Sequence, residues 1–235
     1  MAVFDRVVVG VDGTEWGFEA LRQALALAPA GAAVEAVTAL HTGPAVWTGF
    51  DAPHWAELLT SEAQAARDAS ATLLAGRPCA SARVVPGDPV DVLRRARDDG
   101  DATLLAIGGR HSSRLLGIVM GDTATELLHD AACSVLVARP GAPGTWEPRR
   151  VVVGVDASEP SRLAQATADE LAARLGATVQ VVSDAQQPVA ALVERSRDSD
   201  LVVVGSRGLH GLHALGSVSE RVAHRAACSV LVVHN

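Results

Sequence analysis

The sequence predicts an α/β protein in which helices cover sheets of parallel strands. Of its 235 residues, 49% are hydrophobic and only 3% are aromatic, so the core is expected to consist of Ala, Val and Leu. Short, continuous apolar runs alternate with longer amphipathic stretches along the chain. Continuous apolar runs are typical of strands that are buried on both faces, and intervening helices connect parallel strands. We therefore expect parallel sheets with helices on both faces.

In the first part of the chain, strands and helices alternate regularly. The apolar runs predict strands at 6–11, 34–41, 81–85, 102–107 and 134–138. The amphipathic stretches predict helices at 15–28, 53–75, 89–98 and 123–131. The start of the third helix is marked by Asp88 and Pro89, because Asp is a favoured cap and Pro is favoured at the first helical position.

The second part of the chain repeats the first. The segment "RVVVGVDGTE" at 6–15 returns as "RVVVGVDASE" at 150–159, an offset of 144 residues. The segment "LLAIGGR" at 104–110 returns as "LVVVGSR" at 201–207, an offset of only 97. The second copy therefore lacks 47 residues, which corresponds to one helix and one strand.

Two domains follow from this repeat. We predict a complete first domain at 1–139 with five strands, a Pro- and Gly-rich linker at 140–149, and a shortened second domain at 150–235 with about four. Strands of the second domain are expected at 151–155, 178–183, 201–204 and 229–233, and helices at 160–175, 188–196 and 217–225. The pattern leaves open which strand of the full unit is missing.

The composition argues against several classes of protein. The formal net charge of −7 disfavours general affinity for nucleic acid or for anionic membranes. The chain contains no apolar run as long as a membrane span and no pattern of a secretory signal, so we expect a cytoplasmic protein. Three scattered cysteines (Cys79, Cys133 and Cys228) are too few for a disulfide framework or a metal site. The matching strings "AACSVLV" indicate structural thiols at Cys133 and Cys228.

Several motifs occur in a fixed order and carry a resemblance. The segments "VVGVDG", "GDPVDVLRRA", "VGSRG", "GSVSERVAH" and "CSVLVV" resemble the universal stress protein family, here in tandem form. The resemblance implies adenine-nucleotide-hydrolase-like (Rossmann-like) domains with the strand order 3-2-1-4-5. It also implies that the two units pair through their last strands within one chain, and it leaves a further homodimer open. Some members bind ATP, and others lack the site and dimerise.

Members that bind ATP resemble one another in a motif of Gly, two residues, Gly, nine residues, and then Gly-Ser or Gly-Thr. Backbone N–H groups and the positive end of a helix dipole hold phosphates in such a loop. The first copy keeps the spacing with Gly108 and Gly121, but it has His111 at the second glycine and Asp122 at the hydroxyl position. The Asp122 carboxylate either occupies the position of the phosphates or simply caps the following helix.

The second copy has the residue types of the motif in a loop that is two residues shorter. These are Gly205, Gly208, Gly216 and Ser217, with Arg207 beside them. The resemblance places the three glycines and Ser217 at the phosphates, and Arg207 either at a phosphate or in solvent. The structural alternatives are a strand-exit turn at Gly205 and Gly208, and a capping box that begins at Ser217.

The ends of the first strands of the two copies complete the candidate sites. The resemblance places Val155 and Asp156 at the nucleoside in the second copy, and the matching residues of the first copy are Val11 and Asp12. The carboxyl ends of parallel strands are where α/β sheets bind ligands. Alternatively, each aspartate caps the helix that follows it.

The sequence leaves two functions to compare. The first is a cytoplasmic stress-response protein that binds ATP, with Mg, in its second domain in preference to its first. The second is a family member without nucleotide that acts through pairing and protein interaction. The chain has no Gly-Lys-Ser/Thr phosphate loop and no set of nucleophile and base, so we expect no dedicated enzyme and no catalytic residue.

Overall fold

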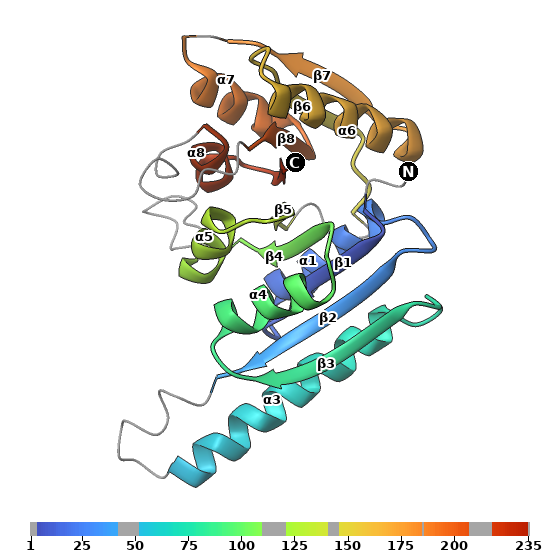
Figure 1. The fold of residues 1–235 in the computed structure, drawn as a ribbon, viewed down its shortest axis with the longest axis vertical. Helices are drawn as coiled ribbons and strands as arrows, with labels where there is room; N and C mark the ends of the chain where they lie inside the picture. Colours follow the sequence, from blue (N-terminus) through green and yellow to red (C-terminus); the bar gives the residue numbers. More distant parts are fainter. Residues whose placement is uncertain are drawn as a thin grey trace. The chain divides into compact units, whose positions relative to one another are not determined.

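The computed structural model describes residues 4–41, 52–109, 121–140, 146–184, 186–206 and 218–234. Contacts divide the chain into two compact units, Ala2–Ile107 and Gly108–Asn235, with Met1 counted in the latter. Each unit is an α/β arrangement of strands and covering helices (Figure 1). The predicted fold class is therefore confirmed.

The first unit contains four parallel strands in the order β3-β2-β1-β4. These strands are β1 (Arg6–Gly10), β2 (Ala33–Leu40), β3 (Ala80–Pro86) and β4 (Leu104–Gly108). Helices α1 (Glu15–Leu27) and α3 (Ala52–Leu73) contact each other and cover one face, whereas α4 (Pro89–Asp99) lies on the other. As predicted, Asp88 caps α4 through Val90 N–H (2.9 Å), and Pro89 is its first residue.

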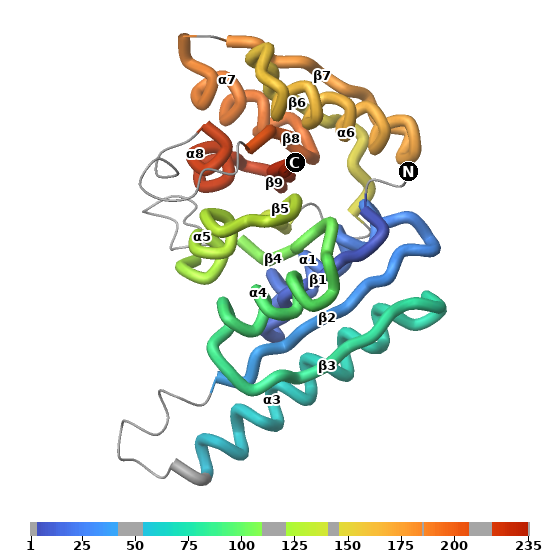
Figure 2. Tube along the Cα trace, in the orientation of Figure 1, coloured from blue at the N-terminus to red at the C-terminus, as the bar shows by residue number. Residues whose placement is uncertain are grey.

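The second unit contains five strands in the order β5-β9-β8-β6-β7 (Figure 2). They are β5 (Ser134–Ala138), β6 (Arg150–Gly154), β7 (Thr178–Val182), β8 (Leu201–Gly205) and β9 (Ser229–Val233). Neighbours are parallel except for β5 and β9, which pair antiparallel with Leu136 opposite Leu231. The helices are α5 (Asp122–His129), α6 (Glu159–Leu175), α7 (Pro188–Arg195) and α8 (Val218–Arg225), with a short 3-10 turn at Ser196–Asp198.

The structure identifies the segment that the second copy lacks. Strand β7 pairs with β6 in the same register in which β2 pairs with β1, so β7 corresponds to β2. In the first copy β2 has β3 on its other side and α3 against its face. The missing helix and strand are therefore the counterparts of α3 and β3. Among the described residues, the first copy has five strands and the second has four, as predicted.

The division by contacts differs from the repeat in the sequence. Helix α5 and strand β5 belong to the first copy, yet they cluster with the second, because β5 pairs with β9. The boundaries at 1–139 and 150–235 describe the sequence repeat and stay a prediction.

The core of each unit consists of Val, Leu and Ala side chains, as the composition indicates. Strands β5 and β9 are buried along their whole length. Over the described part of the chain, every helix is too short or too polar to cross a bilayer.

Candidate functional site

In the first copy, a tight turn connects the carboxyl end of β1 to helix α1. Asp12 is exposed, and its Oδ1 accepts hydrogen bonds from the N–H (3.0 Å) and the hydroxyl (2.6 Å) of Thr14. Thr14 is the N-cap of α1, and its Oγ1 accepts from Gly17 N–H at 3.3 Å. The buried Val11 N–H donates to Val37 O (3.0 Å) and so continues the β1–β2 ladder.

The second copy builds the same turn between β6 and α6. Asp156 Oδ1 accepts from the N–H (3.1 Å) and the hydroxyl (2.5 Å) of Ser158. Ser158 is the N-cap of α6 and accepts from Ser161 N–H at 3.4 Å. Val155 N–H donates to Val182 O at 2.9 Å, as Val11 does to Val37. The two copies therefore present equivalent carboxylates at equivalent strand ends.

The alternative in which Asp12 and Asp156 cap their helices is wrong in detail. Thr14 and Ser158 are the caps, and each aspartate instead holds the hydroxyl of the cap two residues later. The spacing Asp-x-Thr and Asp-x-Ser was the signal in the sequence, because Asp accepts from the backbone two residues on and a hydroxyl residue caps the helix.

Gly205 at the end of β8 has a structural reason to be glycine. A Cβ atom there would overlap the carbonyl group of Pro160 and would lie 2.9 Å from the Pro160 Cβ. The start of α6 therefore crosses directly over the end of β8. The next residue, Ser206, donates its N–H to Val233 O (2.8 Å). The end of β8 is therefore fixed by Pro160 of α6 and by the end of β9. Gly108 ends β4 in the first copy.

The helix starts differ between the two copies. Gly121 is the N-cap of α5 and Asp122 is its first residue, so the prediction that Asp122 caps the helix is wrong by one position. Asp122 is exposed in the first turn, where its carboxylate lies near the positive end of the helix dipole. Helix α8 begins at Val218, and the acid in its first turn is Glu220.

Part of the predicted site lies in segments outside the described residues. His111, Arg207, Gly208, Gly216 and Ser217 lie outside the described residues. The phosphate loops at 110–120 and 207–217 stay predictions, and so does the capping box at Ser217.

A contact that the sequence reasoning missed joins the helices α5 and α8. His129 Nε2 lies 2.9 Å from Glu220 Oε1, and both side chains are largely buried. His224 follows Glu220 by one helical turn. Burial lowers the pKa of His224, with His129 and Arg139 acting in the same direction and Glu220 opposing them. The matching strings "HDAACS" and "HRAACS" were the signal, since they place one histidine at the end of each helix.

Arg139 ties the end of β5 to the second copy. Its guanidinium donates to Ala223 O and to Cys228 O (3.1 Å), and its backbone N–H donates to Ser229 Oγ (2.9 Å). Ala223 lies in the last turn of α8, where carbonyl groups have no partner within the helix. Arg139 is 3% exposed, and burial lowers its pKa to about 10.

The cysteines differ in exposure. Cys133 is buried, and burial raises the pKa of Cys228 to about 12, so that this thiol stays protonated at neutral pH. Cys79 is exposed. Among the residues that the structure describes, no three His, Cys, Asp or Glu side chains are grouped to hold a metal ion.

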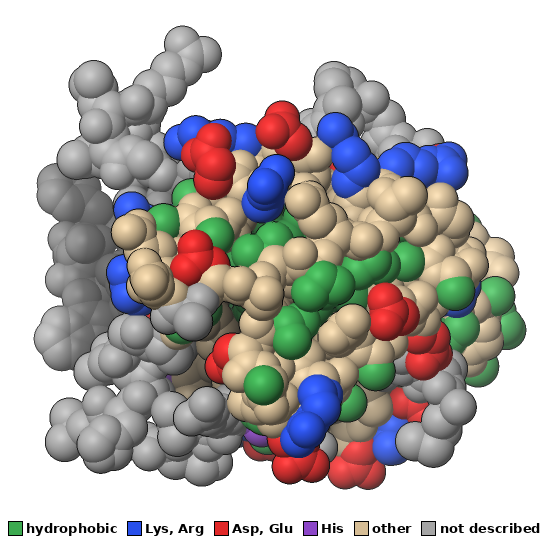
Figure 3. Space-filling view, turned by 90° about the horizontal axis from the view of Figure 1, so that it is seen from above, with side chains coloured by type: hydrophobic (Ala, Val, Ile, Leu, Met, Phe, Trp, Pro, Cys, Tyr) green, Lys and Arg blue, Asp and Glu red, His purple; other side chains and the backbone are tan. Residues whose placement is uncertain are grey.

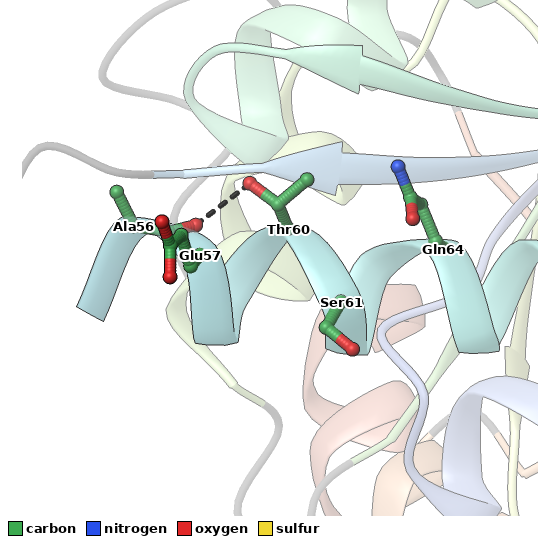
Figure 4. Close-up of a pocket in the computed structure, with 5 residues that line it drawn as sticks. All are labelled: Ala56, Glu57, Thr60, Ser61 and Gln64. Atoms are coloured by element: carbon green, nitrogen blue, oxygen red, sulfur yellow. Dashed lines mark hydrogen bonds between the residues drawn. The ribbon is translucent and has the colours of Figure 1, made fainter. Parts of the chain in front are cut away.

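An open depression on α3 lies apart from these strand ends. Its lining side chains come from α3 alone, and Thr60 Oγ1 in it donates to Ala56 O at 2.7 Å (Figure 4). One exposed helix face offers no second element that could enclose a ligand. We assign no site to it.

The strand order and the covering helices define an α/β protein with a Rossmann-like fold. The family model for the universal stress protein family matches residues 4–139 and 180–234. The chain belongs to the universal stress protein family. Universal stress protein Rv2623 of Mycobacterium tuberculosis (strain H37Rv) is similar, at 30% identity over 214 residues that cover 69% of this chain and 71% of that protein.

Three further comparisons agree with this membership. Universal stress protein Rv2005c of Mycobacterium tuberculosis is 28% identical over 194 residues, which cover 61% of this chain and 65% of the relative. The crystal structure of a universal stress protein from Archaeoglobus fulgidus covers 98% of both chains with a TM-score of 0.75 and 19% identity. A putative universal stress protein from Pseudomonas aeruginosa gives a TM-score of 0.69 at 16% identity, covering 98% of this chain and 93% of that one. At these identities the structural likeness concerns the fold.

Proposed function

We propose that this chain is a cytoplasmic stress-response protein that binds ATP, with Mg, through its second copy. We choose the second copy because the first residues of α5 and α8 differ in charge. In the first copy the Asp122 carboxylate stands at the first position of α5. In the second copy α8 starts with Val218, and its first-turn acid, Glu220, contacts His129.

The electrostatic cost of Asp122 supports this choice. A phosphate that binds at the start of α5 would meet a carboxylate at the same helix end. At about 4 Å and an effective dielectric near 20, one like-charge contact costs roughly 4 kcal/mol. Micromolar binding corresponds to about 8 kcal/mol in total, so this single contact removes a large share of it. The described part of α8 begins with Val218 and Ser219, neither of which carries a carboxylate.

The proposed roles follow the family resemblance. Val155 and Asp156 contact the nucleoside, and Gly208, Gly216 and Ser217 hold the phosphates with assistance from Arg207. Gly205 shapes the exit of β8, since its close approach to Pro160 already requires glycine. The matching residues of the first copy form the weaker site; they are Val11, Asp12, Gly108 and Gly121. We propose binding without dedicated catalysis, because no pair of nucleophile and base accompanies these residues.

The test is titration calorimetry of the purified chain with Mg-ATP, with variants placed in matched positions. Gly208→Glu adds a carboxylate to the second-copy loop, and His111→Glu adds one at the corresponding position of the first. Asp156→Asn and Asp12→Asn remove equivalent carboxylates while keeping an oxygen for the cap. We expect about one ATP per chain, lost in Gly208→Glu, weakened in Asp156→Asn, and unchanged in His111→Glu and Asp12→Asn.

A second candidate function is pairing without nucleotide. It is supported by Asp122 at the first helix start and by the antiparallel β5–β9 pair that Arg139 fastens to the second copy. In this case the two copies would pair through their last strands and present a surface to other proteins. If the folded chain gives no heat of binding at millimolar Mg-ATP, this second function is favoured. If ATP binding is lost in His111→Glu and kept in Gly208→Glu, the nucleotide site lies in the first copy.

A further inference from the structure

The loss of the counterparts of α3 and β3 leaves one strand at an open edge. Strand β7 ends the strand order of the second unit, and among the described residues β6 is its one paired neighbour. Its counterpart β2 is covered by β3 along the edge and by α3 on one face. Val181 is 50% exposed, whereas Ala36, at the same register position of β2, is 2% exposed. The exposure of Val181 therefore follows from the missing segment.

The direction of each group in β7 follows from its pairing with β6. Thr178 N–H donates to Arg149 O (2.8 Å) and Val182 O accepts from Val155 N–H (2.9 Å), so both residues turn their backbone groups toward β6. Because these directions alternate along a strand, Val179 and Val181 turn their N–H and C=O groups to the open edge. This edge offers four backbone groups to a further strand.

The side chains of β7 divide between the two faces of the sheet. A Cβ on Gly154 would meet Leu192 of α7 at 2.9 Å, and Gly154 is in register with Val182. Val182 and Gln180 therefore lie on the α7 side, and Val179 and Val181 lie on the α6 side. The α6 side is the face on which α3 covers β2 in the first copy. Figure 3, which looks onto the end where β7 lies in Figure 1, shows hydrophobic side chains gathered in the middle of a charged rim.

The edge lacks the features that usually protect edge strands. The segment "TVQVV" has neither a charge nor a proline. The edge strand of the first unit, β3, contains Arg83, which pairs with Glu35 at 2.7 Å, and Pro86. Charged residues and proline on an edge prevent further pairing. The first edge is thus protected and the second is open.

We propose that β7 is a self-association edge, on which the β7 strand of a second copy of this chain pairs antiparallel about a two-fold axis through Gln180. The segment Val179-Gln180-Val181 is symmetric about its centre, so each Val179 stands opposite Val181 of the second copy. The outward backbone groups of these valines then form four hydrogen bonds. The four valine side chains meet on the α6 side, where they cover one another.

Charges at the ends of β7 fit the same register. With Gln180 opposite Gln180, Asp184 of one copy lies opposite Gly176 of the other. The Arg149 guanidinium lies close to Gly176, because a Cβ built on Gly176 would be 3.9 Å from it. Asp184 is exposed and is held by the N–H groups of Gln186 and Gln187 (2.8 Å each). Each end of the ladder therefore brings a carboxylate to a guanidinium. Within its own chain, Arg149 forms an ion pair with Glu147 at 2.6 Å in which both side chains are exposed.

The ladder is short, which sets the conditions of the test. Five residues on each side bury less than the roughly 1,200 Å² of a stable interface, so we expect a weak dimer that forms at high protein concentration. Sedimentation velocity between about 1 µM and 100 µM covers the range in which such an affinity is seen. Val181→Lys places a charge next to the two-fold axis, opposite Val179 of the second copy, and should weaken dimerisation at least about tenfold. Ser81→Lys adds the same charge to the exposed edge strand β3 and should leave the dimer unchanged.

A crosslink tests the register independently of Val181→Lys. Gln180 stands opposite itself in a non-hydrogen-bonded pair, where Cα atoms are about 4.5 Å apart and a disulfide can form. In a Cys79→Ser background, which removes the exposed thiol, Gln180→Cys should give a disulfide-linked dimer on mild oxidation, and Ser81→Cys should not. A chain that is monomeric throughout, a dimer that survives Val181→Lys, or equal crosslinking of both cysteine variants would overturn the proposal. If Val181→Lys fails to fold, as judged by circular dichroism, the crosslink alone decides.

Discussion

Arg139 is the side chain for which the structure makes the most demanding prediction about stability. It is 3% exposed and donates to the carbonyl groups of Ala223 and Cys228. Burial lowers its pKa well below the ordinary value, to about 10, which corresponds to a cost of about 3.5 kcal/mol for the charged form at about 1.4 kcal/mol per pKa unit. Two hydrogen bonds from a charged donor contribute about 1.5–3 kcal/mol each.

These terms predict the effect of Arg139→Met. The substitution removes about 3–6 kcal/mol of hydrogen bonding and recovers about 3.5 kcal/mol of burial cost, so the loss of stability lies between about −0.5 and 2.5 kcal/mol. We expect a loss in the upper part of this range, about 2 kcal/mol, because the methionine leaves the Ala223 and Cys228 carbonyl groups without their donor. Arg139→Lys keeps the charge but has no fork to reach both carbonyl groups, so its loss should be smaller.

Urea unfolding at pH 7, followed by circular dichroism, measures both differences from the midpoint and the slope. Arg139→Met that is as stable as the parent chain, or more stable, would refute the reasoning. It would show that burying the guanidinium destabilises the chain by more than its two hydrogen bonds stabilise it. Such a balance is known for buried ion pairs, whose replacement by apolar groups can be stabilising.

Three further predictions follow from single positions. Ala157 has φ +63° at the position where Gly13 of the first copy has φ +79°. Because glycine adopts positive φ without strain, Ala157→Gly should raise the free energy of unfolding and Gly13→Ala should lower it, each by about 1 kcal/mol. Urea unfolding measures both changes. Burial lowers the pKa of His224 below 6.5, so the unfolded chain binds a proton at higher pH than the folded chain, and stability falls as the pH drops through 6.5. His224→Gln should reduce this pH dependence between pH 7.5 and 5.5, and an unchanged dependence would contradict the assignment. Gly205→Ala should destabilise the chain by about 2 kcal/mol or more, the usual cost of overpacking, because the added Cβ overlaps Pro160. The effect should appear in thermal unfolding without nucleotide. A variant as stable as the parent chain would show that the start of α6 can move.

The sequence by itself determined the elements and their order. The alternation of apolar and amphipathic segments placed the described strands and α-helices of both copies to within about two residues, because burial on both faces leaves a periodic signal. The cap of α4 followed from Asp88-Pro89 for the same local reason. The repeat itself was visible as matching strings, since related strands keep their apolar residues.

Features that depend on long-range contacts required the tertiary structure. Only the pairing of β7 with β6 showed that the missing strand is the counterpart of β3. The register between two strands depends on their packing in the fold and cannot be deduced from the sequence of either strand alone. The aspartates at the two strand ends were recognised, but their use as acceptors for the caps Thr14 and Ser158 depends on the turn geometry. Asp122 was placed one residue from its actual role because helix ends depend on backbone angles.

The contacts between the two copies were the least visible in the sequence. Arg139 and Ala223 are separated by 84 residues, and His129 and Glu220 by still more. A polar side chain is buried only when folding brings its partner to it, and no local pattern records that partner. The sequence therefore determined the family, the elements and the candidate nucleotide residues, whereas the tertiary structure decided which strand is open and which buried charges hold the copies together.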